Sequence, residues 1–418
     1  RQTMADIAAV YDLKSQARAL CAVEGDADRN RFVLATLNLR ASNELHVLEF
    51  NEDTNEVRAV EVCAQPHEVW DVASCPSTTS ASRLLVVANE GVSSHHAALL
   101  DLACLADGDD LLGTGGTARG TMKPAPAEML RLVPPSSTAG LMRRALWNPN
   151  GDAAHAITVQ PGGLHQWALD AGTAKPEPSA LCPAAVAFAD SSEAASKAGG
   201  RAPTVETASW DPHHAHTLAC GGTAGALSTI DLRTMKQAAS LAHAHRGPIR
   251  TISYNPNRPY VLATAGDDRA IKLWDLRKAS GAPPTASSAH AAGGSAASAL
   301  LELPSAHMHA PACCAYNRFH DQLLLSGGTD CALKLWRAAA VSSSPPTNEP
   351  LDGVDGAAAD TDPDSEADGL VRSLGCHEES VYSVVWSVAD AWLFGSLSFD
   401  GRFAINYVPA AEKYRILL

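Results

Sequence analysis

Three segments in the second half of the chain carry the same polar residues at the same spacing. Counted from a histidine, a serine or threonine follows at offset 19, an aspartate at offset 23, and a tryptophan, once replaced by asparagine, at offset 29. The three sets are His245, Thr264, Asp268 and Trp274; His307, Ser326, Asp330 and Trp336; and His377, Ser396, Asp400 and Asn406. A catalytic triad occurs once per site, whereas a structural device can recur along a chain. The repetition therefore indicates a structural role, and no catalytic residue is assigned.

Between these positions, each copy has the pattern of short strands joined by tight turns. In the first copy, an alternating run at 249–254 is followed by an Asn-Pro-Asn turn, an apolar run at 260–265, an Asp-rich turn and a last run at 270–274. Three or four strands in about 40 residues that end in Trp-Asp are typical of a WD40 β-propeller blade. In such blades the four polar residues form a hydrogen-bonded chain, here called the blade lock. Each buried polar group would cost about 1–3 kcal/mol if left unpaired.

The strand pattern continues toward the N-terminus, although the lock is lost. Ala224 and Ile230 occupy the aspartate and tryptophan positions of the preceding copy. Further strand runs are found at 209–212, 217–222 and 226–232; at 145–149, 156–160 and 164–169; at 68–74, 83–88 and 97–102; and at 31–39 and 44–50. The sequence thus predicts seven blades. We expect residues 9–14 to supply the strand that closes the ring, with residues 414–418 competing for the same open edge.

Chain length agrees with seven blades once four segments are treated as insertions. These are 108–127, 171–202, 278–306 and 338–372, and the remainder is about 43 residues per blade, within the usual ~40–45. The sequence therefore predicts an all-β fold, a single seven-bladed WD40 propeller over residues 1–418. The insertions are expected to be disordered because they have too few apolar residues to bury. The last insertion carries eight acidic residues before Arg372 and is interpreted as a solvated acidic loop.

Composition argues against several classes of function. With 32 basic and 46 acidic residues, the net charge of −14 disfavours nucleic acid or an anionic membrane as the main partner. No apolar run approaches the ~18 residues of a membrane span. The ten cysteines form no Cys-x-x-Cys pair, and no glycine-rich phosphate loop is present, so no metal or cofactor is expected. The histidines at 213, 214 and 216 are interpreted as turn residues.

Several stretches resemble one particular family of propellers. They are Ala17-Arg-Ala-Leu20, Trp210-Asp-Pro-His-His214, the run from Asn255 to Asp268, the run from Asn317 to Leu325, His377-Glu-Glu-Ser-Val-Tyr382 and Lys413-Tyr-Arg-Ile-Leu-Leu418. Together they are similar to the EARP- and GARP-interacting WD40 propeller family, nearly from end to end. The resemblance implies a non-enzymatic cytoplasmic adaptor that binds vesicle-tethering complexes in endosomal recycling and in endosome-to-trans-Golgi retrograde transport. It implies a monomeric propeller within a complex, peripheral at those membranes and not inserted in them.

Two other functions remain open from the sequence. Asp231-Leu-Arg233 and Asp275-Leu-Arg277 end two successive blades and resemble the doubled Trp-Asp-x-Arg signature of propellers that recruit substrates to cullin-RING ubiquitin ligases. The structural interpretation is that Asp-Leu-Arg is a common WD40 strand ending. The chain could equally be a fixed structural subunit of a larger assembly. The residues assigned as candidate partner contacts are Arg250, Arg269, Arg233 and Arg277, with Tyr382 and Trp392 as candidate aromatic anchors.

Overall fold

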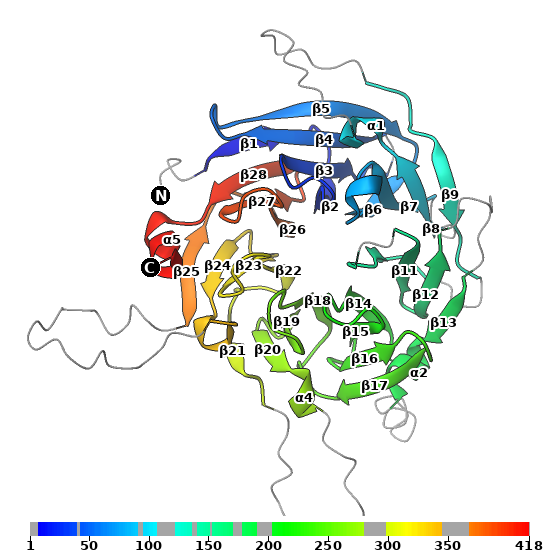
Figure 1. Ribbon diagram of the computed structural model, residues 1–418, viewed down its shortest axis with the longest axis vertical. Coiled ribbons are helices and arrows are strands. Elements are labelled where there is room, and N and C mark those ends of the chain that lie inside the picture. The colour runs from blue at the N-terminus through cyan, green and yellow to red at the C-terminus, as the bar shows by residue number, and fades with distance from the viewer. Residues whose placement is uncertain are drawn as a thin grey trace, which may run out of the picture.

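The fold is a closed ring of seven antiparallel sheets, each with four strands (Figure 1). The computed structural model describes residues 7–39, 42–90, 95–106, 122–135, 140–150, 153–169, 178–189, 203–279, 298–344 and 368–417. Within each sheet, neighbouring strands pair in chain order from the central axis outward, apart from the last sheet. The predicted seven-bladed propeller is confirmed.

The first four blades are formed by β2 (Ala17–Ala22), β3 (Asn30–Thr36), β4 (Asn43–Asn51) and β5 (Glu56–Gln65); β6 (Glu68–Ser74), β7 (Arg83–Asn89), β8 (His95–Asp101) and β9 (Glu128–Leu132); β10 (Arg144–Trp147), β11 (His155–Gln160), β12 (Gly163–Ala168) and β13 (Ala180–Pro183); and β14 (Val205–Trp210), β15 (Thr217–Gly222), β16 (Leu227–Asp231) and β17 (Lys236–Leu241).

The last three are formed by β18 (Ile249–Tyr254), β19 (Val261–Gly266), β20 (Ile271–Asp275) and β21 (Leu301–Leu303); β22 (Pro311–Tyr316), β23 (Leu323–Gly328), β24 (Leu333–Arg337) and β25 (Gly369–Leu374); and β26 (Val381–Trp386), β27 (Leu393–Ser398), β28 (Arg402–Tyr407) and β1 (Ala9–Asp12). The described helices are α1 (Ala103–Ala106), α2 (Ala184–Ala187), α4 (Leu276–Ala279) and α5 (Ala410–Leu417), with 3-10 turns at Thr78–Ser80 and Ala339–Val341.

Burial decreases from the middle of each blade toward its outer edge. The second strands β3, β19, β23 and β27 are buried along their whole length. They read as nearly continuous apolar runs because both of their faces pack against neighbouring blades. The outer strand β17 is half-buried or exposed throughout. The hydrophobic core therefore consists of layers between blades, and no blade can bury its faces alone.

The ring closes through the N-terminal strand, as the sequence predicts. Strand β1 pairs with β28 from Ala9 opposite Ile405 to Asp12 opposite Arg402. Blade one then packs on blade seven, with the Phe32 and Phe403 rings 5.4 Å apart. The first and last described elements, β1 and α5, thus both contact blade seven. They lie near each other in Figure 1.

The expectation that residues 414–418 compete for this edge is wrong. Residues up to Leu417 belong to α5, which begins after Pro409 and packs Ile416 against the core of blades six and seven. The edge of β28 is already occupied by β1, and a helix satisfies its backbone groups internally, so it needs no sheet edge.

Three of the four predicted insertions contain ordered outer strands. Strand β13 and helix α2 lie within 171–202, β21 lies within 278–306, and β25 begins within 338–372 and ends just after it. In 108–127, Lys123 bonds to the edge of β5 through its backbone. An outermost strand has one sheet neighbour and an exposed face, so its sequence lacks the apolar run that marks an inner strand. Residues 107–121, 170–177, 190–202, 280–297 and 345–367, including most of the acidic segment, lie outside the described residues.

No helix in the described part of the chain is both long enough and apolar enough to span a bilayer.

We expect removal of residues 1–12 to lower the melting temperature by several degrees and to promote aggregation, because it exposes the edge of β28. The matched control is removal of residues 417–418. This truncation removes only the end of α5, where Leu417 is 63% exposed. Thermal unfolding with light scattering measures both. Equal losses in the two truncations would contradict closure by β1.

Candidate functional site

The structure brings each set of lock residues in blades five and six into one hydrogen-bonded chain. In blade five, His245 Nδ1 lies 2.8 Å from Asp268 Oδ1 and Nε2 lies 2.7 Å from Thr264 Oγ1, to which Trp274 Nε1 donates at 2.8 Å. Because the carboxylate only accepts, Nδ1 carries the proton and Nε2 accepts from the hydroxyl. The set tightly ties the segment before β18 to the inner strands of its blade.

Blade six repeats this geometry almost unchanged. His307 Nδ1 lies 2.9 Å from Asp330 Oδ1 and Nε2 lies 2.7 Å from Ser326 Oγ, while Trp336 Nε1 donates to the same hydroxyl at 2.8 Å. Burial lowers the pKa of His307, although Asp330 partly offsets this effect. A neutral histidine held between two partners has no free nitrogen for catalysis.

Hydrogen bonds to the lock aspartate stabilise its charge. Burial alone would raise the pKa of Asp268, but hydrogen bonds from His245 and from the backbone N–H groups of Arg246 and Ala270 hold it at about 2. From its place in the turn between β19 and β20, the aspartate thereby accepts hydrogen bonds from three donors. Its loss would leave all three without an acceptor.

Blade seven departs from the predicted arrangement at two positions. His377 Nε2 lies 2.7 Å from Ser396 Oγ, but Nδ1 lies 2.8 Å from Ser398 Oγ, and it is Ser398 that donates to Asp400. Asp400 therefore acts through a serine and does not contact the histidine. Asn406 does not replace the tryptophan either, because neither of its buried amide atoms reaches Ser396. An asparagine is too short to span the distance that an indole covers.

Blade three contains a partial lock that the sequence spacing missed. Trp167 Nε1 donates to Thr158 Oγ1 at 2.8 Å, and both side chains are fully buried. The turn between β11 and β12 is one residue shorter than in blade five, because Val159 faces Leu164 whereas Ala265 faces Ile271. The tryptophan consequently follows the hydroxyl at offset 9 and not 10. A search that allowed this shift would have found it.

The turns define two faces of the ring. The lock face carries the turns between the second and third strands, such as 266–270, and the segments that enter each first strand. The opposite face carries the remaining turns, such as 255–260 and 231–235. Strand β20 runs from one to the other, with Arg269 just before it and Arg277 just after it. The four candidate arginines therefore do not form a single surface.

Two of these arginines lie on the lock face. Arg250, the second residue of β18, donates from Nε and Nη2 to the two oxygens of Asp267 at 2.7 and 2.6 Å, and its Nη1 lies 3.4 Å from Glu206. Arg269 is exposed and adopts a φ of 67° at the tight turn. It thus extends from the turn, whereas Arg250 is anchored by two carboxylates.

The other two arginines lie on the opposite face and fold back onto their own turns. Arg233 donates from Nε and Nη2 to Asp231 at 3.1 and 3.0 Å, and Arg277 donates likewise to Asp275 at 2.9 and 2.7 Å. Their side chains remain 68% and 57% exposed. This within-turn pairing is what the structural interpretation of the Asp-Leu-Arg ending predicts.

The two candidate aromatic anchors lie on different faces and are both partly buried. Tyr382 is on β26 near the channel, where the Arg18 guanidinium lies 5.2 Å from its ring centroid. Trp392 lies in a turn of the opposite face and stacks on His320 at 4.4 Å. Each ring therefore already has an intramolecular contact.

The histidine cluster near residue 214 has structural partners. His213 Nε2 lies 3.0 Å from the carbonyl of Asn255, and His214 Nδ1 lies 2.9 Å from Asp211. Across the described residues, no group of three or more histidine, cysteine or acidic side chains is placed to hold a metal ion. All ten cysteines are free thiols.

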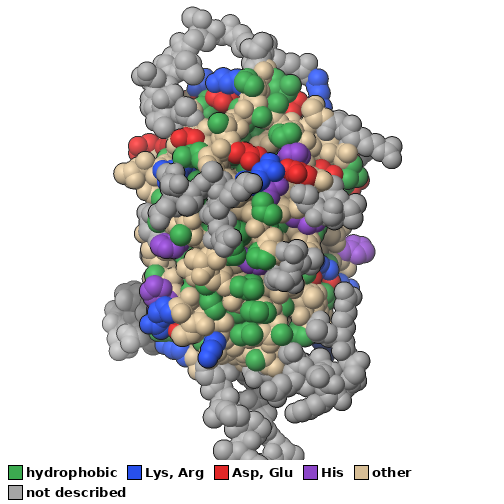
Figure 2. All heavy atoms as spheres, turned by 90° about the vertical axis from the view of Figure 1, so that its right-hand side faces the viewer, with side chains coloured by type: hydrophobic (Ala, Val, Ile, Leu, Met, Phe, Trp, Pro, Cys, Tyr) green, Lys and Arg blue, Asp and Glu red, His purple; other side chains and the backbone are tan. Residues whose placement is uncertain are grey.

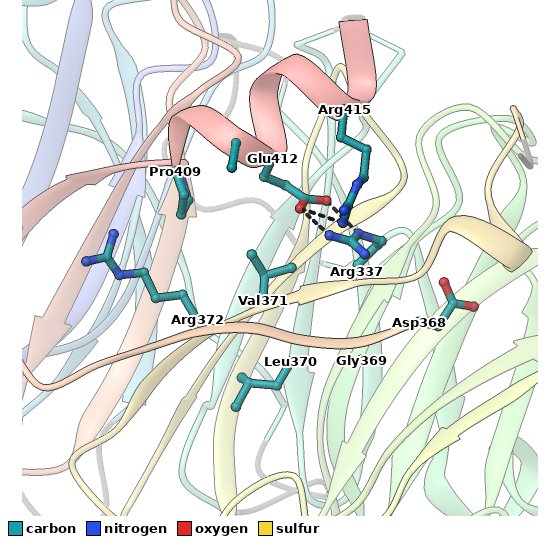
Figure 3. A pocket seen from close by; sticks show the side chains of 10 residues that line it. Arg337, Asp368, Gly369, Leu370, Val371, Arg372, Pro409, Glu412 and Arg415 are labelled. Carbon is teal, nitrogen blue, oxygen red and sulfur yellow. Dashed lines mark hydrogen bonds and ion pairs between the residues drawn. The ribbon is translucent and has the colours of Figure 1, made fainter. Parts of the chain in front are cut away.

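A cleft of about 560 Å³ lies at the rim, between β25 and α5 (Figure 3). Glu412 is buried there and accepts from Arg337 Nε at 2.7 Å and from its Nη2, while Arg415 lies 3.8 Å away. Figure 3 shows the two guanidinium groups converging on this carboxylate. Because the pair joins residues 75 positions apart, the sequence spacing could not reveal it. Its role is to hold α5 against blade six.

Charges on the visible rim are mixed. Figure 2 shows basic side chains scattered among acidic and neutral ones, with hydrophobic side chains gathered in the lower part of the view. On β9, Arg131 pairs with Glu90 at 2.7 Å and with Glu128 at 2.9 Å.

A family model described as EIPR1 beta-propeller matches residues 5–336, and a WD domain, G-beta repeat model matches 369–405. The chain is 30% identical to "EARP-interacting protein homolog" of Gekko japonicus and 28% identical to "EARP and GARP complex-interacting protein 1" of Homo sapiens, in each case over 99% of both chains. It is 28% identical to "WD repeat-containing protein DWA2" of Arabidopsis thaliana over 95% of both chains.

We expect Asp268→Ala to destabilise the protein by about 1–3 kcal/mol, because it leaves His245 and two backbone N–H groups unpaired. The matched variant Asp400→Ala should cost less, since His377 keeps both serines as partners. Urea unfolding of the two variants and the parent protein measures this difference. A loss for Asp400→Ala as large as for Asp268→Ala would contradict the distinction between the two locks.

Acid should destabilise blade seven through His377. Burial lowers the pKa of His377 to about 4, whereas an unfolded histidine titrates near ~6.5. The unfolded state therefore binds the extra proton first, and stability present above pH ~6.5 is lost as the pH falls toward 4. This group contributes at most about 3 kcal/mol. In melting curves from pH 7 to 5, His377→Gln should show a smaller decrease than the parent. An unchanged pH profile would show that His377 does not titrate in this range.

Proposed function

Because the chain belongs to the EIPR1 β-propeller family, we propose that it is a non-enzymatic scaffold that binds vesicle-tethering complexes. The observation that carries this proposal is the similarity over 99% of the chain to proteins named for interaction with the EARP complex or with the EARP and GARP complexes. A propeller suits such a role because its blades hold the turns of two faces in place while the side chains on them vary.

In its finer form, the proposal is that the protein acts as a cytoplasmic adaptor. It serves tethering complexes in endosomal recycling and in retrograde transport from endosomes to the trans-Golgi network. It binds there as one propeller within a larger complex, is peripheral at these membranes and does not insert into them. Protein subunits, not nucleic acid, are the partners, as the net charge of −14 favours.

Affinity purification of the tagged protein with quantitative mass spectrometry tests this function. Subunits of one or both tethering complexes should copurify in near-stoichiometric amounts, with a tagged unrelated propeller as control. A cullin-RING ligase adaptor as the main stoichiometric partner, without tether subunits, would overturn the proposal in favour of a substrate receptor. Constant stoichiometry with some other assembly would instead identify a fixed structural subunit.

We place the partner on the lock face of blades five to seven. The two complete locks and the serine relay of blade seven hold these turns rigid, and rigid surfaces lose less conformational entropy on binding. Arg269 is exposed at this face and Arg250 lies beside it on β18. The opposite-face arginines, Arg233 and Arg277, would be the contacts for a ligase adaptor.

We expect Arg269→Glu to weaken association with a tether subunit several-fold while leaving the melting temperature unchanged, because an exposed turn side chain contributes little to stability. Arg233→Glu, which removes an exposed arginine from the opposite face, is the matched control. Arg250→Glu is a poorer test of binding. The new glutamate would face Asp267 and Glu206, and like-charge repulsion would lower the stability of the protein. If Arg233→Glu impaired binding and Arg269→Glu did not, the partner would lie on the opposite face.

A further inference from the structure

The first strand of nearly every blade contains the same irregularity. In blades one, two, four, five, six and seven, the pairing register shifts by one residue near the start of the strand, as in a β-bulge. The shift follows the first paired residue, or the second in blade two. Blade three has the equivalent position at Arg143, which precedes β10 and donates its N–H to Val159. A bulge redirects the side chain of the extra residue. Seven such residues, one per blade, stand at equivalent positions: Arg18, Trp70, Arg143, Glu206, Arg250, Ala312 and Tyr382.

Contacts between blades show that these residues, here called the channel ring, converge on the central axis. Arg143 Nη1 and Arg250 Nη1 lie 2.9 and 3.4 Å from the same Glu206 carboxylate oxygen. Tyr382 in blade seven lies near enough to help raise the pKa of Arg250 in blade five, although blade six separates them along the perimeter. The first strands surround the central opening in Figure 1. Since each bulge lies at the start of its strand, the ring stands at the lock-face mouth of the channel.

One arginine of the channel ring differs from the others. The Arg18 guanidinium lies 4.5 Å from the Trp70 ring centroid and 5.2 Å from that of Tyr382, between two aromatic rings. No carboxylate of the described residues comes within ion-pair distance of it, and no described group accepts a hydrogen bond from it. Burial lowers the pKa of Arg18, and Asp71 offsets this only at longer range. Arg18 is thus a partly buried cation whose N–H donors have no acceptor among the described residues and are left to solvent.

The charges around the ring leave one cation in excess. Arg143 and Arg250 share Glu206, and Arg250 also binds Asp267. Behind the ring, Arg144 Nε lies 3.9 Å from Asp71. Four arginines therefore face three carboxylates, in a protein whose net charge is −14. Aromatic faces hold a guanidinium by its plane and leave its edge free, and that edge matches a carboxylate in a bidentate pair.

We propose that the channel ring is a binding site for an acidic side chain of an extended partner segment, with Arg18 as its bidentate contact. The segment lies across the lock-face mouth and places an aspartate or glutamate against the free edge of Arg18. Trp70 and Tyr382 hold the guanidinium in position and offer apolar surface to the neighbouring residues of the segment. The carboxylate replaces solvent as the acceptor and pairs with a guanidinium that has no ion-pair partner among the described residues.

The test is fluorescence polarisation with short labelled peptides of the same sequence, rich in glutamate, in glutamine or in phosphoserine. The glutamate peptide should bind the full-length protein, and its affinity should fall with added salt. The Arg18→Gln variant should bind it at least about tenfold more weakly, as expected for loss of a charge-assisted bidentate contact. The glutamine peptide should not bind.

Two controls separate this site from general charge attraction. Arg246→Gln removes an exposed arginine from the same face but not from the ring, and it should change the affinity by less than about twofold. Ala312→Glu adds a carboxylate to the ring at the bulge of β22 and should compete with the peptide, whereas Ala312→Gln should not. Because Ala312→Glu leaves Arg18 in place, it keeps the test decisive even if Arg18→Gln folds poorly.

The inference is wrong if the glutamate peptide does not bind, if Arg18→Gln and Ala312→Glu both bind it like the parent, or if only the phosphoserine peptide binds. The measurement uses synthetic peptides, so it does not depend on whether a tethering complex is the partner. Conversely, failure to copurify tether subunits would overturn the proposed function and leave this site intact.

Discussion

Each blade of this protein depends on its two neighbours for burial of its faces. The second strands are buried on both sides, so a blade with an open side would expose a continuous apolar surface. The chain satisfies this constraint only when the last blade meets the first. Pairing of β1 with β28 and contact between Phe32 and Phe403 complete the ring. The position of every turn, and therefore of every candidate contact, follows from that closure.

The same burial makes unpaired polar groups costly, and the blades meet that requirement in different ways. Blades five and six use the complete lock, in which the aspartate binds the histidine directly. Blade seven inserts Ser398 between His377 and Asp400, and burial without a direct carboxylate leaves the pKa of His377 at about 4. Blade three has the bond between Trp167 and Thr158. The blades therefore use different hydrogen-bonding arrangements to pair their buried polar groups.

Turn geometry also decides which charged side chains are available to a partner. Arg233 and Arg277 each pair with the aspartate two residues earlier, which closes their own turns. Arg269 extends from a tight turn, and the bulge of β2 directs Arg18 to the mouth of the channel. An interaction scaffold needs such fixed, outward-directed groups more than it needs a pocket. The lock face and the channel ring combine them on one side of the protein.

The sequence alone was sufficient to predict the seven-bladed fold, the closing strand near residues 9–14 and the lock sets of blades five and six. These features depend on local periodicity and fixed spacing, both of which can be read directly from the sequence. It could not predict the outer strands β13, β21 and β25, because a half-exposed edge strand needs no apolar run. It also missed the pair between Arg337 and Glu412 and the convergence of Arg18 with Tyr382. Arg337 and Glu412 meet because α5 packs back onto blade six at the rim, and Arg18 and Tyr382 meet because closure of the ring sets blade one beside blade seven.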